Sequence, residues 1–153
     1  MSILVTGIAG FIGSYFAKRF MKARPRVPLV GIDDLSNGRR EAIPSGATFY
    51  HGSICDRDLL TRVFANHAPS YVFHFAALPR VAYSVEHPRE SAETNVMGTL
   101  TLLEAAARSG VRRLIFSSSS SVYGNSTVLP TRESAPPDPR SPYALQKYMG
   151  ELL

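Results

Sequence analysis

The sequence SPYALQK, near the end of the chain, places a tyrosine and a lysine four positions apart. Ser141 and Pro142 suit the cap and the first position of a helix, so we expect a helix over residues 142–153. Tyr143 and Lys147 would then share one face of that helix. A lysine ammonium beside a phenol lowers the pKa of the phenol from about 10. Such a tyrosine can take a proton from a substrate hydroxyl and return it to a carbonyl, as hydride transfer at an alcohol carbon requires.

A run of serines at 117–121 could supply a hydroxyl that orients the substrate oxygen. Its composition alone is also typical of a flexible linker. Because the run directly follows the apolar segment RLIF, the carboxyl end of a strand is the better interpretation, and ligands bind at that edge of parallel sheets. A tyrosine and a lysine at this spacing usually mark an ordinary helix surface, so the pair gains weight only from what precedes it.

What precedes it begins with ILVTGIAGFIGS, in which three glycines lie between an expected strand and an expected helix. Gly7 permits a sharp turn, Gly10 lets the backbone approach a pyrophosphate, and Gly13 lets the helix pack closely against the sheet. The free amides of Phe11 and Ile12 at the helix start would face the phosphates. The loop therefore predicts a dinucleotide site, although three glycines alone could serve plain turns.

An acidic residue about 20 positions after the glycine loop supports the same site. Asp33 ends the apolar run LVGID, where a carboxylate accepts hydrogen bonds from ribose hydroxyls. It would also repel a 2′-phosphate, which favours NAD over NADP. Arg39 and Arg40 could hold that phosphate, but a solvated loop is the more ordinary explanation. We expect Asp34 to form hydrogen bonds locally within the turn DDLSNG.

Short apolar runs alternate with helical stretches along the whole chain. Most of the expected strands are nearly continuous apolar runs, which is typical of parallel strands covered on both faces. Strands that alternate with helices predict a doubly wound α/β fold of the Rossmann type. The expected strands are 3–6, 27–33, 48–51, 71–77 and 112–118, and the expected helices are 11–23, 56–66, 88–109 and 142–153.

Composition narrows the class of protein. With 44% hydrophobic and 19% charged residues the chain resembles an ordinary globular domain, and it has no apolar run long enough to span a membrane. The net charge of +5 suits an anionic ligand, but the basic residues form no single stripe, so we expect no nucleic-acid partner. A single cysteine, Cys55, fits a cytoplasmic protein. The histidines are too dispersed for a metal site, and His74 is expected in the core.

In their order, the glycine loop, the acid, the serine-ended strand and the Tyr–Lys pair resemble the amino-terminal half of extended short-chain dehydrogenase/reductases. The similarity is greatest to NAD-dependent nucleotide-sugar enzymes of the UDP-glucose 4-epimerase type. The segments that carry it are VTGIAGFIGS, GIDDLSNGRR, FHFAALPRVAYSVEHP, ETNVMGTLTLLEAA, FSSSSSVYG and SPYALQK, which together cover almost the whole chain. The resemblance implies a Rossmann sheet with bound NAD, and a reaction that oxidises a sugar at C4 and returns the hydride to the other face.

The resemblance also implies roles for particular residues. Tyr143 would be the acid/base, Lys147 would tune it and hold the nicotinamide ribose, and Ser119 would orient the substrate hydroxyl. Ser120 and Ser121 would line the sugar pocket. The implied cofactor contacts are Gly7, Gly10, Phe11, Ile12, Gly13, Asp33, Asn37, Gly38, Ser53, Ile54, Phe75, Ala76, Ala77, Leu78, Tyr143 and Lys147.

Three departures from the family pattern affect these expectations. Ser53 stands where an aspartate often contacts adenine, which leaves Ile54 to supply most of the packing. Pro79 and Arg80 stand where some epimerases have a lysine. Serines at 120–121 replace the Asp–Glu pair of sugar 4,6-dehydratases, and because hydroxyls cannot easily drive elimination of water, a dehydratase is disfavoured.

Two segments have open alternatives. Thr94 and Asn95 either bond backbone near the cofactor or are structural. Tyr83 and Ser84, expected in a loop, either face the substrate or are exposed to solvent.

Members of the resembled family are about twice as long as this chain, so we expect an incomplete Rossmann domain over residues 1–153 without the carboxy-terminal substrate domain. Exposed apolar helix faces would then favour a homo-oligomer through helices 88–109 and 142–153, or a partner that completes the fold. The expected function is an NAD-dependent nucleotide-sugar 4-epimerase. The alternatives are a non-catalytic NAD-binding module, or another family enzyme such as a uronate epimerase, a reductase or a dehydratase.

Overall fold

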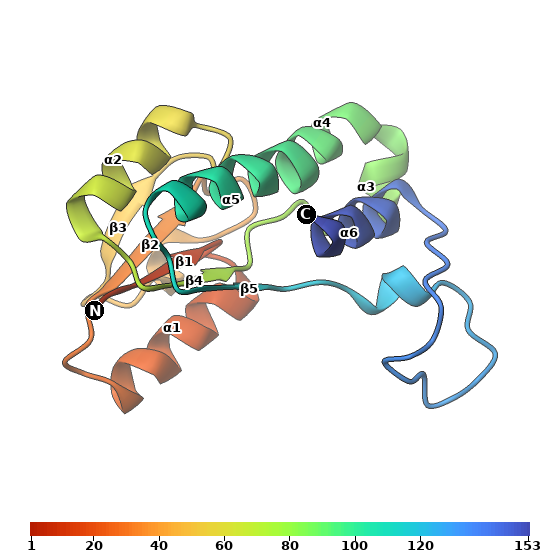
Figure 1. Ribbon diagram of the computed structural model, residues 1–153, viewed down its shortest axis with the longest axis horizontal. Coiled ribbons are helices and arrows are strands. Elements are labelled where there is room, and N and C mark those ends of the chain that lie inside the picture. The colour runs from red at the N-terminus through yellow and green to blue at the C-terminus, as the bar shows by residue number, and fades with distance from the viewer.

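The computed structural model describes residues 1–153, and its centre is a five-stranded sheet (Figure 1). The strands are β1 (Ile3–Thr6), β2 (Leu29–Asp33), β3 (Thr48–His51), β4 (Tyr71–His74) and β5 (Arg113–Phe116). They lie in the order β3-β2-β1-β4-β5, and all neighbouring strands are parallel. The winding direction reverses between β1 and β4, which opens a crevice at the carboxyl edge of the sheet. The doubly wound fold predicted from the sequence is confirmed.

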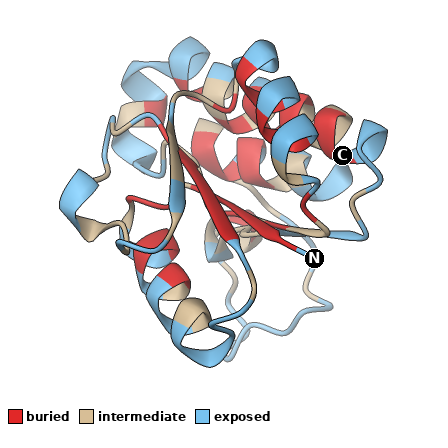
Figure 2. Cartoon of the chain, turned by 90° about the vertical axis from the view of Figure 1, so that its left-hand side faces the viewer, coloured by how far each residue is buried: buried red, intermediate tan, exposed pale blue.

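Helices cover both faces of this sheet. α1 (Phe11–Ala23) lies on one face, and α2 (Arg57–His67) and α5 (Thr99–Arg108) lie on the other (Figure 1). Because successive strand residues point to opposite faces, β1 contributes to two buried clusters. Leu4 belongs to the cluster under α2 and α5, and Ile3 and Val5 belong to the one under α1. Figure 2 shows the buried residues along the strands and on the inner sides of the helices.

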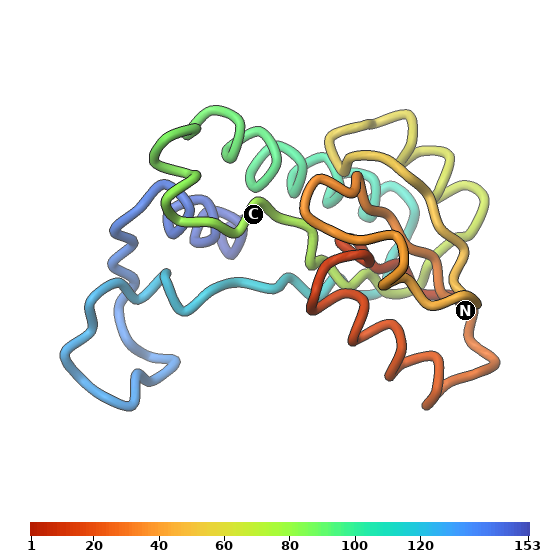
Figure 3. Tube along the Cα trace, turned by 180° about the vertical axis from the view of Figure 1, so that it is seen from behind, coloured from red at the N-terminus to blue at the C-terminus, as the bar shows by residue number.

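The predicted helix 88–109 is a helical run in three parts. These are α4 (Pro88–Ala92), a π-helical turn η2 (Glu93–Gly98) and α5, and a separate helix α3 (Val81–Glu86) precedes them where the sequence predicted a loop. α6 (Pro142–Leu152) packs against α3, α4 and η2, as Figures 1 and 3 show from opposite sides. Two short 3₁₀ helices are η1 (Arg40–Ala42) and η3 (Ser120–Tyr123). No helix combines the length and the apolar character that crossing a membrane requires.

The strands differ from the prediction in exposure and in length. β1 and β2 are buried along their whole length, as expected for central strands. β5 instead alternates between exposed and half-buried residues, with Arg113 and Ile115 exposed, because it lies at the edge with β4 as its neighbour. The predicted strands 27–33, 71–77 and 112–118 are also longer than the observed ones. After β4 and β5 the chain leaves the sheet early, and these segments form loops at its carboxyl edge.

Candidate active site

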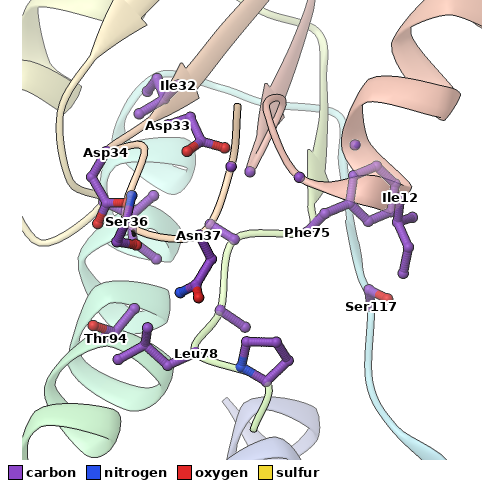
Figure 4. A pocket seen from close by; sticks show the side chains of 18 of the residues that line it. Ile12, Ile32, Asp33, Asp34, Ser36, Asn37, Phe75, Leu78, Thr94 and Ser117 are labelled. Atoms are coloured by element: carbon purple, nitrogen blue, oxygen red, sulfur yellow. Dashed lines mark hydrogen bonds between the residues drawn. The ribbon is translucent and has the colours of Figure 1, made fainter. Parts of the chain in front are cut away.

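A cleft of about 420 Å³ crosses the carboxyl edge of the sheet. The loops that follow all five strands contribute to its walls, together with residues of α6. Figure 4 shows Asp33 and Asn37 on one side of this cleft, with Ile12 and Ser117 on the opposite side. Every residue predicted to contact a cofactor, from Gly7 to Lys147, lines this cleft.

The glycine loop brings the start of α1 into the cleft. Gly7 has a φ of +71°, and a Cβ on it would lie 2.6 Å from the amide nitrogen of Ala76. A Cβ on Gly13 would overlap the carbonyl oxygen of Gly7, so α1 can lie this close to the loop only with glycine there. No side chain caps the start of α1. The amides of its first turn are therefore available to an anionic group in the cleft.

Asp33 stands at the end of β2 and is 8% exposed. Its Oδ2 accepts a hydrogen bond from the Ala9 amide at 2.9 Å, and its Oδ1 accepts one from the Leu35 amide at 2.8 Å. These two bonds tie the carboxylate to the glycine loop and leave lone pairs for a ligand in the cleft. Asp34 accepts hydrogen bonds from the amide and the hydroxyl of Ser36, which confirms the predicted local turn.

α6 presents Tyr143 and Lys147 to the cleft. The helix begins as the sequence predicts, because Ser141 Oγ accepts a hydrogen bond from the Ala144 amide at 3.1 Å and Pro142 occupies the first position. Tyr143 and Lys147 share one buried face and are 8% and 4% exposed. The sheet and α6 therefore bring the two predicted catalytic residues to the same cleft as the glycine loop.

Lys147 is a buried cation held by one carbonyl group and one ring. Its Nζ donates a hydrogen bond to the carbonyl oxygen of Ser117 at 2.9 Å and lies 4.7 Å from the centre of the Phe116 ring. Burial lowers the pKa of Lys147 from 10.5 to about 8. The pKa of His74 is lowered to about 3, first by its own burial and second by the charge of Lys147. Lys147 thus loses its proton at a far lower pH than an exposed lysine.

The prediction that Lys147 lowers the pKa of Tyr143 is wrong for this structure. Burial raises the pKa of the phenol above its usual value of 10.0, and the neighbouring Ser119 hydroxyl offsets only part of that effect. The Lys147 ammonium is directed at the Ser117 carbonyl and the Phe116 ring. Tyr143 is therefore protonated at neutral pH in this structure, which suits the acid half of acid/base work.

The predicted substrate serines do not line the cleft. Ser117 and Ser118 do so instead, because the chain runs extended from β5 into the cleft before it turns. Ser119 caps η3, and its Oγ accepts a hydrogen bond from the Ser121 amide at 3.1 Å. Ser119 still lies close enough to Tyr143 to influence the pKa of its phenol, so its role at the substrate oxygen remains a prediction.

Several residues of the cleft were not among the predicted contacts. Most of them follow the end of a strand by one to a few positions, and this position is the signal that could have found them. They are Ile32, Asp34, Ser36, Gly52, Pro79, Arg80, Thr94, Ser117 and Ser118.

Two of the open alternatives are settled by hydrogen bonds. The Asn95 side chain donates to the carbonyl of Leu78 at 3.1 Å and accepts from the amide of Leu78 at 2.8 Å, so it bonds backbone at the cleft wall. Ser84 lies in α3, is fully buried, and accepts a hydrogen bond from the Tyr143 amide at 3.0 Å. Ser84 is therefore not exposed to solvent, and it does not line the cleft. Instead, it holds the first turn of α6.

His74 is the satisfied core histidine that the sequence predicted. Thr99 Oγ1 donates to the Asn95 carbonyl at 2.7 Å, so Nε2 of His74 must be the donor in its 3.0 Å bond to Thr99. Nδ1 then accepts from Thr6 Oγ1 at 2.6 Å. The ring is neutral and fully bonded. No group of three or more metal-ligating side chains occurs in the chain.

Fold and cleft place the chain among the Rossmann folds, which bind dinucleotides. The chain belongs to the NAD dependent epimerase/dehydratase family, whose model matches residues 3–153. It is 43% identical to a UDP-glucose 4-epimerase of Streptomyces lividans over 145 residues, which are 94% of this chain and 44% of that protein.

Solved structures agree with this assignment. The UDP-glucose 4-epimerase of Thermotoga maritima with UDP-glucose matches with a TM-score of 0.95 and 44% identity, over 99% of this chain and 49% of that one. The Thermus thermophilus UDP-glucose 4-epimerase complex with NAD matches with a TM-score of 0.93 and 38% identity, again over 99% and 49%. The chain spans about half the length of the relatives it matches.

Because the Lys147 ammonium is buried, the free energy of unfolding should change with pH in the alkaline range. Between about pH 8 and 10.5 the unfolded chain keeps the lysine proton and the folded chain has lost it, so the free energy of unfolding gains a contribution that rises with pH. This contribution reaches about 3 kcal/mol at most. Urea unfolding across this pH range should show the rise when the wild type is compared with Lys147→Met.

Groups such as Cys55, whose pKa burial raises, contribute with the opposite sign but do so in both proteins, so the difference isolates Lys147. Lys18→Met is the matched control, because Lys18 is exposed. The difference in free energy of unfolding between the wild type and Lys147→Met should therefore rise from about pH 8 to 10.5. A difference that does not change over this range would contradict a buried Lys147 ammonium.

Proposed function

We propose that the cleft binds NAD. The observation that carries this proposal is that one cleft is lined by the Asp33 carboxylate, the uncapped start of α1 and the buried Tyr143–Lys147 pair. A ribose diol suits Asp33, a diphosphate suits the first amides of α1, and a second ribose suits the Lys147 ammonium. The cradle also leaves no room for a Cβ at Gly7 or Gly13.

We propose further that the protein is an NAD-dependent nucleotide-sugar 4-epimerase of the UDP-glucose/UDP-galactose type. NAD, when bound, would accept and return a hydride at the sugar C4, and its positively charged ring would favour the ionised form of a nearby phenol. Tyr143 would take the proton of the C4 hydroxyl and give it back to the C4 carbonyl. Ser119 would orient that oxygen, with Ser120 and Ser121 toward the sugar. Lys147 would hold a ribose hydroxyl of the bound NAD.

The chain spans about half of its relatives, so the substrate site is proposed to need residues beyond those described. On this proposal residues 1–153 form the NAD-binding Rossmann domain, and a substrate domain is supplied by further chain or by a partner. A second candidate function is a non-catalytic NAD-binding module. It is favoured by one observation, that the serines at 119–121 lie outside the cleft wall.

Replacing the proposed acid/base separates these two functions. Tyr143→Phe is expected to lower the interconversion of UDP-glucose and UDP-galactose by at least about 100-fold, because no group remains to move the proton. The affinity for NAD should change by less than about threefold, since the ring is kept. The interconversion is measured by a coupled assay and the NAD affinity by calorimetry, in each case on the protein expressed from its natural gene.

Tyr148→Phe is the control, because Tyr148 lies on the same helix but not in the cleft. A wild type that binds NAD and turns over no nucleotide sugar would support the binding module. Equal losses of turnover and of NAD affinity in Tyr143→Phe would show a structural tyrosine.

We also propose that the protein is a cytoplasmic homo-oligomer that associates through the helices over 88–109 and 142–153. The supporting observation is exposed apolar surface on these helices, with Met97 47%, Leu145 49% and Met149 40% exposed. An apolar patch of this kind on neighbouring elements is typical of an association surface.

Light scattering at several concentrations tests the oligomer. The expected mass is at least twice that of one chain, and Leu145→Lys should lower it because a charge would be buried in the interface. Tyr15→Lys, on α1, serves as the control substitution because α1 lies on the opposite face of the sheet from α5 and Tyr15 is exposed (Figure 1). A mass of one chain at every concentration would contradict the proposal.

A further inference from the structure

α6 buries an amide side chain on the same face as Tyr143 and Lys147. Gln146 follows Tyr143 by three positions and precedes Lys147, and it is 5% exposed. It does not line the cleft. A buried primary amide is costly unless its donors and acceptor are bonded, so its partners show what the helix is held against.

Both ends of the Gln146 amide are hydrogen-bonded to other elements. Nε2 donates to Ser91 Oγ of α4 at 2.8 Å. Oε1 accepts from Nδ2 of Asn95, which lies in the π-helical turn η2, also at 2.8 Å. Ser91 and Asn95 are 0% and 2% exposed, so these bonds are shielded from water. Gln146 therefore connects α6 with two separate parts of the helical run before α5.

Asn95 extends the connection to the cleft. Its side chain forms both hydrogen bonds with the backbone of Leu78, and Leu78 lines the cleft between the end of β4 and α3. The series Ser91–Gln146–Asn95–Leu78 thus joins the helix that carries the Tyr–Lys pair to the cleft wall. It crosses η2, and π-helical turns often mark functional sites.

We propose that Gln146 is a positioning residue that fixes the rotation and depth of α6, and with them the places of Tyr143 and Lys147 relative to the cleft wall at Leu78. This inference rests on the proposed function only for what the pair does there. Hydrogen bonds suit this task better than apolar contacts, because each is satisfied at one geometry. Loss of the amide leaves one N–H of Asn95 without a partner and removes the bond to Ser91, whose hydroxyl still donates to the Pro88 carbonyl, so α6 is free to shift.

The titration of Lys147 is sensitive to such a shift, because the groups around its ammonium depend on the position of α6. The groups that face it are the Ser117 carbonyl, the Phe116 ring and the neutral His74, with Tyr143 on its own helix. If α6 rotates or lifts, the bond to Ser117 lengthens and water reaches the ammonium. The lysine should then titrate more like an exposed one.

The experiment follows the three lysines of the chain by NMR after labelling their side chains with ¹³C at Cε. Lys18 and Lys22 are exposed residues of α1 and serve as internal references. In Gln146→Met, which keeps the side-chain length, the titration midpoint of Lys147 should rise by about one pH unit or more toward those of the references. Ser91→Ala, which removes one partner only, should raise it less. NAD affinity should fall about tenfold in Gln146→Met.

A matched control removes a hydrogen bond elsewhere. Tyr50→Phe deletes the 2.8 Å bond between Tyr50 and His67, far from α6, and should lower stability without moving the Lys147 midpoint. Circular dichroism identifies the folded variants, and Ser91→Ala decides the matter if Gln146→Met does not fold.

The proposal is overturned if a folded Gln146→Met, or in its absence Ser91→Ala, keeps the wild-type midpoint of Lys147. It is also overturned if Lys147 of the wild type titrates together with Lys18 and Lys22. Failure of the wild type to bind NAD would instead remove the proposed function, and the lysine titrations would still report on the Gln146 bonds.

Discussion

α6 must bury polar side chains, and the rest of the site is arranged around that constraint. Tyr143, Gln146 and Lys147 lie on the inner face of this helix and need partners, because an unbonded polar group in the interior costs stability. Four separate segments hold the helix. Ser84 in α3 accepts from the Tyr143 backbone amide, Ser91 in α4 and Asn95 in η2 bond the Gln146 amide, and the Ser117 carbonyl after β5 accepts from Lys147. Hydrogen bonds therefore specify the position of α6, and apolar packing alone would not define its rotation. The same bonds hold α6 against the cleft.

The sheet provides the other half of the site through its parallel order. Because all five strands end at one edge, groups that are far apart in the sequence meet along a single cleft. The glycine loop adjoins the chain leaving β4, where Ala76 leaves no space for a side chain at Gly7. Its amide at Ala9 also orients Asp33. The core histidine His74, bonded through Thr99 toward Asn95, links this central region to the helical run that supports α6.

Much of this could be predicted from the sequence because the signals are local. Gly13 and Asp33 have fixed positions relative to a strand and a helix, and Ser141 with Pro142 marks the start of α6. The features that could not be predicted depend on the path of the chain after a strand. Whether Ser117 or Ser119 enters the cleft is decided by where η3 turns, and an alternating edge strand cannot be told from a buried one when its run is apolar. The pKa of Tyr143 and the partners of Gln146 depend on burial in the tertiary structure, and the spacing of residues in the sequence does not show this.

The central claim is that one dinucleotide lies along this cleft between Asp33 and the α6 pair. A crystal structure of the chain with NAD tests it most directly. The account predicts adenosine ribose oxygens within hydrogen-bond distance of the Asp33 carboxylate, the diphosphate at the start of α1, and the nicotinamide ribose at Lys147. A dinucleotide bound in the reverse direction, or outside this cleft, would contradict it.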